Sequence, residues 1–153
     1  MSPILIDVDG SRFQMTDAVN GVLYDFYGIQ VKLQISWTAR DSTNAWLVLD
    51  RDGNGVIDSA KEMFGNITRQ PRSPDANGFL ALAEYDKAVN GGNSDGVIDH
   101  SDAVFLSLRL WQDKNHDGVS EWSELHTLPD LDVESISLDF RESRRTDRYG
   151  NQF

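Results

Sequence analysis

The stretch DKNHDGVSEWSE, residues 113–124, carries acidic or amide side chains at alternating positions and ends on a glutamate. Gly118 stands where such a loop must turn sharply, so that the alternating side chains can point inward together. A hard cation such as Ca²⁺ takes about six to eight oxygen ligands, and the loop pattern D-x-[DN]-x-[DN]-G-x5-E is filled at every position. We therefore predict a calcium site here rather than a solvated turn. The predicted ligands are Asp113, Asn115, Asp117, the carbonyl of Val119, Glu121 and Glu124.

The same pattern recurs earlier in the chain, in DRDGNGVIDSAKE at residues 50–62. It repeats the same spacing but has Lys61 where the last acid belongs, and Glu62 follows one residue later. We predict a loop lengthened by one residue, although a lost ligand and an ordinary glycine turn are the alternatives. Ile57 is apolar at the position where paired loops join by a short β-bridge. The predicted ligands are Asp50, Asp52, Asn54, the carbonyl of Val56, Asp58 and Glu62.

Another candidate loop is DKAVNGGNSDGVIDHSD, residues 86–102. Counting back from Gly96 puts the first ligand position on Gly91, which has no side chain. We predict that Asp86 supplies this ligand across an insertion, with Asn90 as its rival and a vacant loop as the alternative. The predicted ligands are Asp86, Asn93, Asp95, the carbonyl of Val97, Asp99 and Asp102.

Two earlier stretches start like calcium turns and then lack further acids. They are DVDG at residues 7–10 and YDFYGIQ at residues 24–30, and we expect both to be structural turns. The histidines His100, His116 and His126 show no metal-binding spacing, and we expect them to be solvated, with His116 pointing outward from its loop.

The composition limits the function classes. The chain has 153 residues, which favours one domain, and no cysteine, which excludes disulfides and thiolate metal sites. A net charge of -11 opposes binding to nucleic acid or to anionic membranes. No apolar run can span a bilayer, and the opening MSPILIDVDG lacks a signal-peptide pattern. Without nucleophile, phosphate-loop or zinc motifs, we expect no enzyme activity, no catalytic residues and no cofactor besides about three Ca²⁺ ions.

Hydrophobic periodicity predicts a strand at 3–9, two strands within 19–37, and a strand or helix end at 45–50. It predicts helices at 76–89, 101–112 and 120–128 and a strand at 133–140. This order indicates a single α+β domain, residues 1–153. We expect a small N-terminal β-sheet (1–40), an EF-hand-like part with helix–loop–helix calcium sites (41–130), and a closing strand and tail (131–153). A methionine-rich calcium sensor is disfavoured, because the chain has only three methionines.

Four stretches together resemble a known family: WLVLDRDGNGVID followed by EMFGN (46–58 and 62–66), NGFLALAEYD (77–86), SDGVIDHSDAVFLSLRLWQDKNHDGVSEWSELHTL (94–128) and VESISLDF (133–140). They resemble the EF-hand-like calcium domains of large secreted bacterial RTX-type proteins, and above all their calcium-dependent self-processing module. The resemblance implies a monomeric, extracellular domain whose partners are calcium and the remainder of a larger secreted protein. Crowded carboxylates repel one another until a cation binds, so we also expect folding to be coupled to Ca²⁺.

Family members with processing activity cleave an Asp–Pro bond at the start of the domain. The aspartate carboxylate attacks its own peptide carbonyl, and the resulting anhydride hydrolyses or joins a lysine amine. This chain has Ser2–Pro3 at that place, so the mechanism lacks its nucleophile. The resemblance therefore implies calcium ligands in the three loops and a structural or docking role, with self-processing as the alternative. Relatives also tend to read DLDGDG where this chain has DFYGIQ (25–30), so that early site is expected to be lost.

Overall fold

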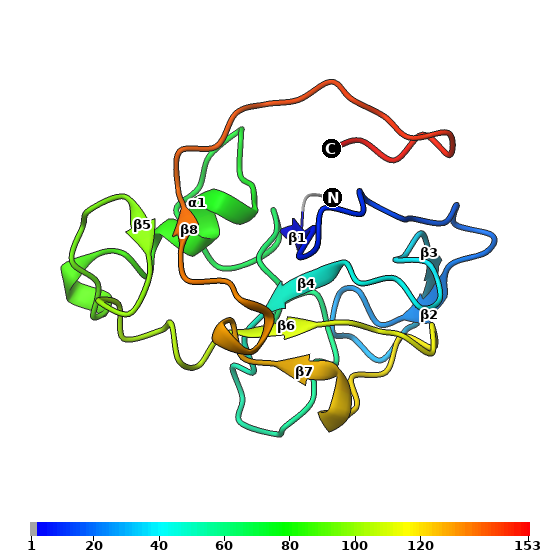
Figure 1. The fold of residues 1–153 in the computed structure, drawn as a ribbon, viewed down its shortest axis with the longest axis horizontal. Coiled ribbons are helices and arrows are strands. Elements are labelled where there is room, and N and C mark those ends of the chain that lie inside the picture. The colour runs from blue at the N-terminus through cyan, green and yellow to red at the C-terminus, as the bar shows by residue number, and fades with distance from the viewer. Residues whose placement is uncertain (1–2) are drawn as a thin grey trace.

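The computed structural model describes residues 3–153, and its centre is a four-stranded antiparallel sheet (Figure 1). The strands are β1 (Leu5–Ile6), β4 (Ala45–Val48), β6 (Arg109–Trp111) and β7 (Leu125–His126), in the order β1-β4-β6-β7. In the register of the two inner strands, Trp46 lies opposite Trp111 and Leu47 opposite Leu110. The sheet thus joins segments that are far apart in the sequence.

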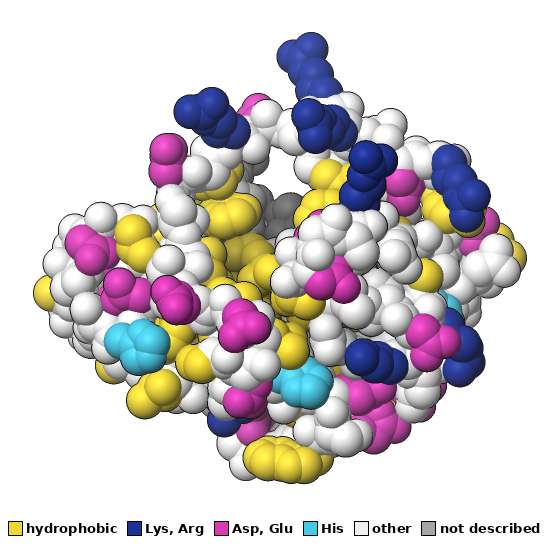
Figure 2. Space-filling model, viewed as in Figure 1, with side chains coloured by type: hydrophobic (Ala, Val, Ile, Leu, Met, Phe, Trp, Pro, Cys, Tyr) yellow, Lys and Arg dark blue, Asp and Glu magenta, His cyan; other side chains and the backbone are white. Residues whose placement is uncertain are grey.

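Two short antiparallel ribbons lie on either side of this sheet in Figure 1. One pairs β2 (Val22–Tyr24) with β3 (Leu33–Ile35), and the other pairs β5 (Val97–Ile98) with β8 (Ile136–Ser137). Figure 2 shows acidic side chains scattered over the lower part of the same face and several Lys and Arg side chains along its upper edge. Among the described residues, no helix is long and apolar enough to cross a membrane.

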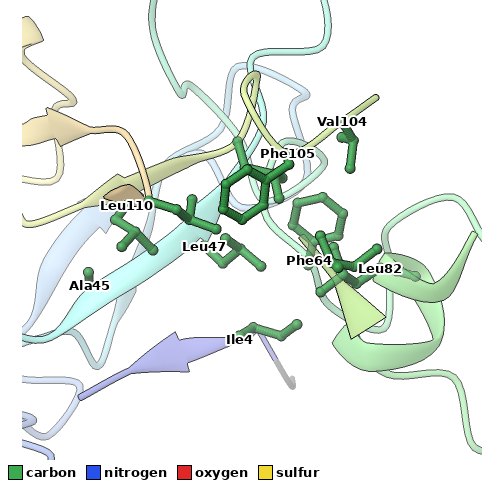
Figure 3. Packing of buried hydrophobic residues seen from close by; sticks show 12 residues of the cluster. Ile4, Ala45, Leu47, Phe64, Leu82, Val104, Phe105 and Leu110 are labelled. Carbon is green, nitrogen blue, oxygen red and sulfur yellow. The ribbon is translucent and has the colours of Figure 1, made fainter. Parts of the chain in front are cut away.

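Both faces of the central sheet are covered, which explains why all four residues of β4 are buried. Ala45 and Leu47 face a cluster that includes Phe64, Phe105 and Leu110, most of which Figure 3 labels. Trp46 and Val48 face the opposite cluster, which is rich in aromatic rings. A strand buried on both faces reads as a continuous apolar run, so periodicity alone left residues 45–50 open between strand and helix end.

The expected α+β architecture with helix–loop–helix sites is wrong. The part of the chain that the structure describes has one short α-helix, α1 (Gly78–Ala83), where a helix over 76–89 was predicted. Asn77 caps it, because its side-chain oxygen accepts a hydrogen bond from Leu80 N at 3.1 Å. Three single-turn 3₁₀ helices cover Ala88–Asn90, Trp122–Glu124 and Pro129–Leu131. The fold is therefore mostly strand and irregular chain, and the predicted calcium loops lie outside any helix pair.

The predicted helix over 101–112 is absent because a local hydrogen bond holds its start in the preceding loop and sheet pairing holds its end in a strand. The buried carboxylate of Asp102 accepts a hydrogen bond from Asp99 N at 2.9 Å and so belongs to the loop before it. Residues 109–111 form β6, which pairs with strands on both sides. The adjacent residues Leu110 and Trp111 are both fully buried, as expected for a strand that is covered on both faces.

The predicted helix over 120–128 is also wrong. It shrinks to the 3₁₀ turn Trp122–Glu124, and the chain then enters β7 beside β6. Gln112 N donates to Glu124 O at 3.0 Å, which continues that pairing into the turn. A helix this short is marginal by itself, so ladder hydrogen bonds and the burial of neighbouring β6 outweigh its local propensity.

Leu47→Ala tests the role of β4 as the shared centre of the core. Leu47 is fully buried in the middle of the sheet, so the substitution should cost about 2–5 kcal/mol of unfolding free energy through lost burial and a residual cavity. The measurement is urea unfolding at constant ion concentration. The control, Val89→Ala, changes a side chain that is 86% exposed and should cost no more than about 0.5 kcal/mol. Equal costs for the two variants would contradict this packing.

Candidate functional site

The three predicted loops share one backbone conformation; they are called here the first (50–62), second (86–102) and third loop (113–124). Each begins with an aspartate whose carboxylate accepts hydrogen bonds from the N–H groups of the turning glycine and of the residue before it. The bonds to the glycine are Asp50–Gly55 at 2.8 Å, Asp86–Gly96 at 2.9 Å and Asp113–Gly118 at 2.8 Å. Those to the preceding residue are Asp50–Asn54 at 3.2 Å, Asp86–Asp95 at 3.2 Å and Asp113–Asp117 at 3.1 Å.

The same two positions in every loop are left-handed. The turning glycines have φ values of 84° (Gly55), 84° (Gly96) and 70° (Gly118). Two residues before each of them, φ is 75° (Gly53), 61° (Ser94) and 60° (His116). Residues other than glycine rarely adopt this backbone conformation, so its recurrence at both positions indicates that the same turn is used in all three loops.

The first loop brings its acids together most closely. Asp50, Asp52 and Glu62 each place a carboxylate oxygen within 4.8 Å of the other two. Glu62 is buried and accepts hydrogen bonds from Arg51 N and Asp58 N, both at 3.0 Å. Lys61, at the position where an acid was missing, points instead toward Gly28 O at 3.5 Å. The geometry thus corresponds to the lengthened loop with Glu62 as its last acid.

The other three predicted ligand residues, Asn54, Val56 and Asp58, lie in the middle of the first loop. The amide nitrogen of Asn54 lies between two carboxylates, at 3.1 Å from Asp52 and 3.3 Å from Asp58. Asn54 Oδ1 accepts a hydrogen bond from Val56 N at 2.8 Å. The acidic side chains of this loop therefore converge on a small volume, and the amide donates hydrogen bonds to two of them.

In the second loop, Asp86 and not Asn90 closes the turn. Asp86 is buried and reaches Asp95 N and Gly96 N, whereas the amide of Asn90 donates to Glu84 O at 2.6 Å, away from the loop. Asp102 closes the other end and is 3% exposed.

The remaining side chains of the second loop hold one another and the backbone. Asn93 Nδ2 donates to Asp95 Oδ2 at 2.9 Å, and Asp95 Oδ1 accepts from Val97 N at 2.9 Å. Asp99 Oδ1 accepts from Ser101 N at 2.8 Å. Four of these five residues were predicted ligands, but among the described residues no three acids of this loop bring their carboxylate oxygens within 4.8 Å of one another, as those of the first loop do.

In the third loop, the first and last acids are both buried. Asp113 is 1% exposed and Glu124 is 8% exposed. Glu124 Oε1 accepts hydrogen bonds from Lys114 N at 2.9 Å and, more weakly, from Asn115 N at 3.5 Å. The sequence spacing placed these acids at the two ends of the loop, and the structure brings both against its backbone.

The middle of the third loop resembles that of the first. Asn115 Nδ2 donates to Asp117 at 3.0 Å and to Glu121 at 3.2 Å, so an amide again bridges two carboxylates. Asp117 Oδ1 accepts from Val119 N at 2.8 Å. Rotating the Asn115 amide by half a turn would present its oxygen in place of the nitrogen, which converts the side chain from donor to ligand.

The last acids of the first and third loops sit in surroundings that disfavour their charge. Burial raises the pKa of Glu62, and the nearby Asp58 and Asp52 add to the rise, against hydrogen bonds that lower it. Burial also raises the pKa of Glu124, together with its contact with Glu121. A cation beside each group would oppose both effects, since opposite charge favours the ionised carboxylate.

Ile57 was expected to join two loops by a short β-bridge, but the contact at this position is of another kind. Ile57 N donates to Ser120 Oγ at 2.6 Å, so the first and third loops meet at equivalent positions through a side chain, and no β-bridge is formed there. The equivalent residue of the second loop, Ile98, pairs with Ile136 in β8. Two loops therefore form a pair, and the remaining loop is attached to a ribbon.

Two further turns repeat the loop conformation with fewer acids than the three predicted loops. Asp25 accepts hydrogen bonds from Ile29 N at 3.1 Å and Gln30 N at 2.6 Å, and Gly28 and Gln30 are left-handed. At the other turn Asp7 accepts from Arg12 N at 3.0 Å. In the Asp25 turn, Tyr27 and Ile29 stand where the three predicted loops have acids or amides, in line with the expected structural turn. The spacing from Asp25 to Gly28 equals that from Asp50 to Gly53, a signal already in the sequence.

Three contacts of the third loop could not be predicted from the sequence. The buried indole of Trp37 donates from Nε1 to Asp113 Oδ2 at 2.7 Å. His116, expected to be solvated, has Nδ1 at 2.7 Å from Thr38 O and Nε2 at 2.9 Å from Asn20 O. No local pattern could have indicated them, because each joins positions more than 70 residues apart.

These features define an acidic, β-rich domain built around repeated aspartate turns. The chain belongs to the SPM domain family, whose model matches residues 4–153. It is also similar to the iron-regulated protein FrpA of Neisseria meningitidis serogroup C, with 35% identity over 152 residues. The match covers 97% of this chain but only 13% of that relative, so the chain spans a small part of the relative's length.

Gly96→Ala and Gly118→Ala test the shared loop conformation. A Cβ on Gly96 meets nothing within 4 Å, so its cost should be the left-handed backbone alone, about 1–2 kcal/mol. A Cβ on Gly118 would lie 3.0 Å from Val22 Cγ2, so this variant should lose more. Urea unfolding of both variants under identical ion conditions gives the comparison. A neutral effect at both positions would rule out the left-handed turns.

Proposed function

We propose that the domain binds calcium at its three loops, about three ions in all, and that it serves as a calcium-dependent structural or docking module. The observation that carries the proposal is the convergence of carboxylate oxygens in the first loop, where three acids approach within 4.8 Å of one another. The recurrence of the same turn in the second and third loops extends it to three sites. Carboxylate, amide and carbonyl oxygens are the ligands that Ca²⁺ takes in proteins.

Unpartnered oxygens support the fit of a cation. Asp102 Oδ1 is buried and has no hydrogen-bond partner among the described residues, and neither has Glu121 Oε2 in the third loop. A buried carboxylate oxygen without a partner is costly, whereas a coordinated one is satisfied. The donor set would supply Asp102 to an ion in the second loop, and Glu121 directly or through water to one in the third.

Electrostatic balance supports the coupling of calcium to folding. The chain has 25 acidic and 14 basic residues, yet the described part contains one salt bridge, Lys87–Glu84 at 2.6 Å. Lysine and arginine therefore do not neutralise the loops. Calcium would remove the repulsion among their carboxylates, and part of its binding energy would become folding energy.

The proposal also covers the place of this domain in a larger protein. A domain that spans 13% of its relative is suited to work as one part of a larger protein. We infer a monomeric, non-enzymatic module of an exported bacterial protein, acting outside the cell, where calcium at about millimolar concentration matches weak sites of this type. Self-processing is not favoured: no aspartate precedes Pro3, and Ser2 lies outside the described residues.

Single-site variants test the ligand assignment. Calcium titration by calorimetry should give about three ions per chain, and Asp50→Ala, Asp86→Ala and Asp113→Ala should each remove one. Asn90→Ala is the matched control for Asp86→Ala, because its amide points away from the second loop. Terbium luminescence gives a second readout, since Trp122 lies within the third loop and can sensitise a bound lanthanide. Unchanged stoichiometry in the aspartate variants would show that the ligands are misassigned.

Removal of calcium should lower stability. At a free concentration 100 times the dissociation constant, each independent site adds about 2.7 kcal/mol to the folded state. Thermal unfolding followed by circular dichroism should therefore shift to a clearly lower midpoint when a chelator is added, and return when calcium is restored in excess. Magnesium at equal concentration is the control, because it prefers rigid octahedral sites with bound water. A midpoint indifferent to chelator would exclude calcium-coupled folding.

A further inference from the structure

The third loop is the surface against which residues 16–41, called here the hairpin segment, are packed. This segment contains β2 and β3. Its end is tied to the loop by Asp41 N, which donates to Lys114 O at 3.0 Å. The two carbonyls that face His116 also belong to it. Gly118 leaves so little room beside Val22 that an added Cβ would approach it to 3.0 Å. The conformation of the third loop therefore determines whether these contacts can form.

The most buried of these contacts is a hydrogen bond to Asp113, a predicted ligand. Trp37 is 2% exposed and Asp113 is 1% exposed, and the indole N–H of the one donates to a carboxylate oxygen of the other at 2.7 Å. Hydrogen bonds to a charged group are among the stronger ones in proteins. Burying this carboxylate is also costly unless both of its oxygens are satisfied. Anything that fixes Asp113 therefore favours the docked hairpin segment.

The second loop lacks such ties. Leu138 N donates to its Gly96 O at 2.9 Å, and Ile98 pairs with β8. Among residues 3–153, no hydrogen bond joins the second loop to the hairpin segment. The two loops share a backbone design but differ in what they are attached to, which makes one a natural control for the other.

We propose that Trp37 is a positioning residue that couples ion binding in the third loop to docking of the hairpin segment. The inference rests on the proposed calcium binding. A cation that fixes Asp113 presents Oδ2 to the indole and so favours docking; docking in turn favours the loop geometry that holds the cation. Coupling of this kind is reciprocal, so a change in Trp37, which is not a ligand, alters the calcium affinity of the third loop.

Trp37→Phe tests the coupling, because it keeps an aromatic ring and removes the N–H donor. The matched control is Trp46→Phe. The two rings belong to one cluster with centroids 4.9 Å apart, but Trp46 Nε1 has no partner among the described residues. Calcium calorimetry on the full chain should show one site weakened about tenfold or more in Trp37→Phe, equivalent to 1.4 kcal/mol. Trp46→Phe should leave the affinities of all sites unchanged within about twofold.

Two double variants show which calcium site Trp37→Phe affects. Trp37→Phe should have no further effect on calcium affinity in an Asp113→Asn chain and its full effect in an Asp86→Asn chain. Hydrogen exchange supplies an independent readout. In calcium, Trp37→Phe should speed exchange of the amides in β2 and β3 by about tenfold, while those of β5 and β8 keep their rates.

His116→Asn provides a second variant if Trp37→Phe does not fold. Asparagine tolerates the left-handed backbone of this position but is too short to reach both Asn20 O and Thr38 O. It should weaken the same site and loosen the same ribbon. Equal calcium affinity in wild type, Trp37→Phe and His116→Asn overturns the coupling and leaves calcium binding standing. A wild-type chain that binds no calcium overturns both.

Discussion

Carboxylates held on left-handed turns are the constraint on which the rest of the structure depends. In each of the three loops, a leading aspartate accepts the N–H groups of the turning glycine and the residue before it, which fixes the bend. This arrangement leaves a set of acids that face one another without basic partners, because the single salt bridge among the described residues, Lys87–Glu84, involves none of the predicted ligands. Backbone and amide N–H groups donate hydrogen bonds to some of these carboxylate oxygens, and the proposed cations would bind the others.

The central sheet gives these loops their places. The first loop follows β4 and the third follows β6, and these strands are neighbours. The two loops meet where Ile57 N donates to Ser120 Oγ. Arg51 extends the connection toward the second loop: its backbone N–H donates to Glu62, and its guanidinium donates to the hydroxyl of Tyr85, next to Asp86. The acidic loops are therefore linked to one another as well as to the two clusters that cover the sheet.

Local features of this molecule could be predicted from the sequence, and non-local ones could not. The turns follow from the spacing of Asp and Gly, which acts within a few residues, and the ribbon β2–β3 follows from clean alternation. The predicted helix over 120–128 is wrong because its later residues pair with β6 as strand β7. The predicted helix over 101–112 is wrong because its apolar residues Leu108, Leu110 and Trp111 suit a helix face or a strand covered on both sides. Only the partners β4 and β7 decide between them. Likewise, spacing left Asp86 and Asn90 as rivals, and nothing near Trp37 indicated a bond to Asp113. Membership of the SPM domain family does not assign the ligands, which experiment has to identify.

The most direct measurement is a crystal structure of the full chain grown with calcium, with a lanthanide soak to locate bound ions by anomalous scattering. The account predicts one ion in each loop, coordinated by Asp50 in the first, Asp86 in the second and Asp113 in the third. Loops that contain only water at saturating calcium, or ions bound elsewhere on the surface, would contradict it.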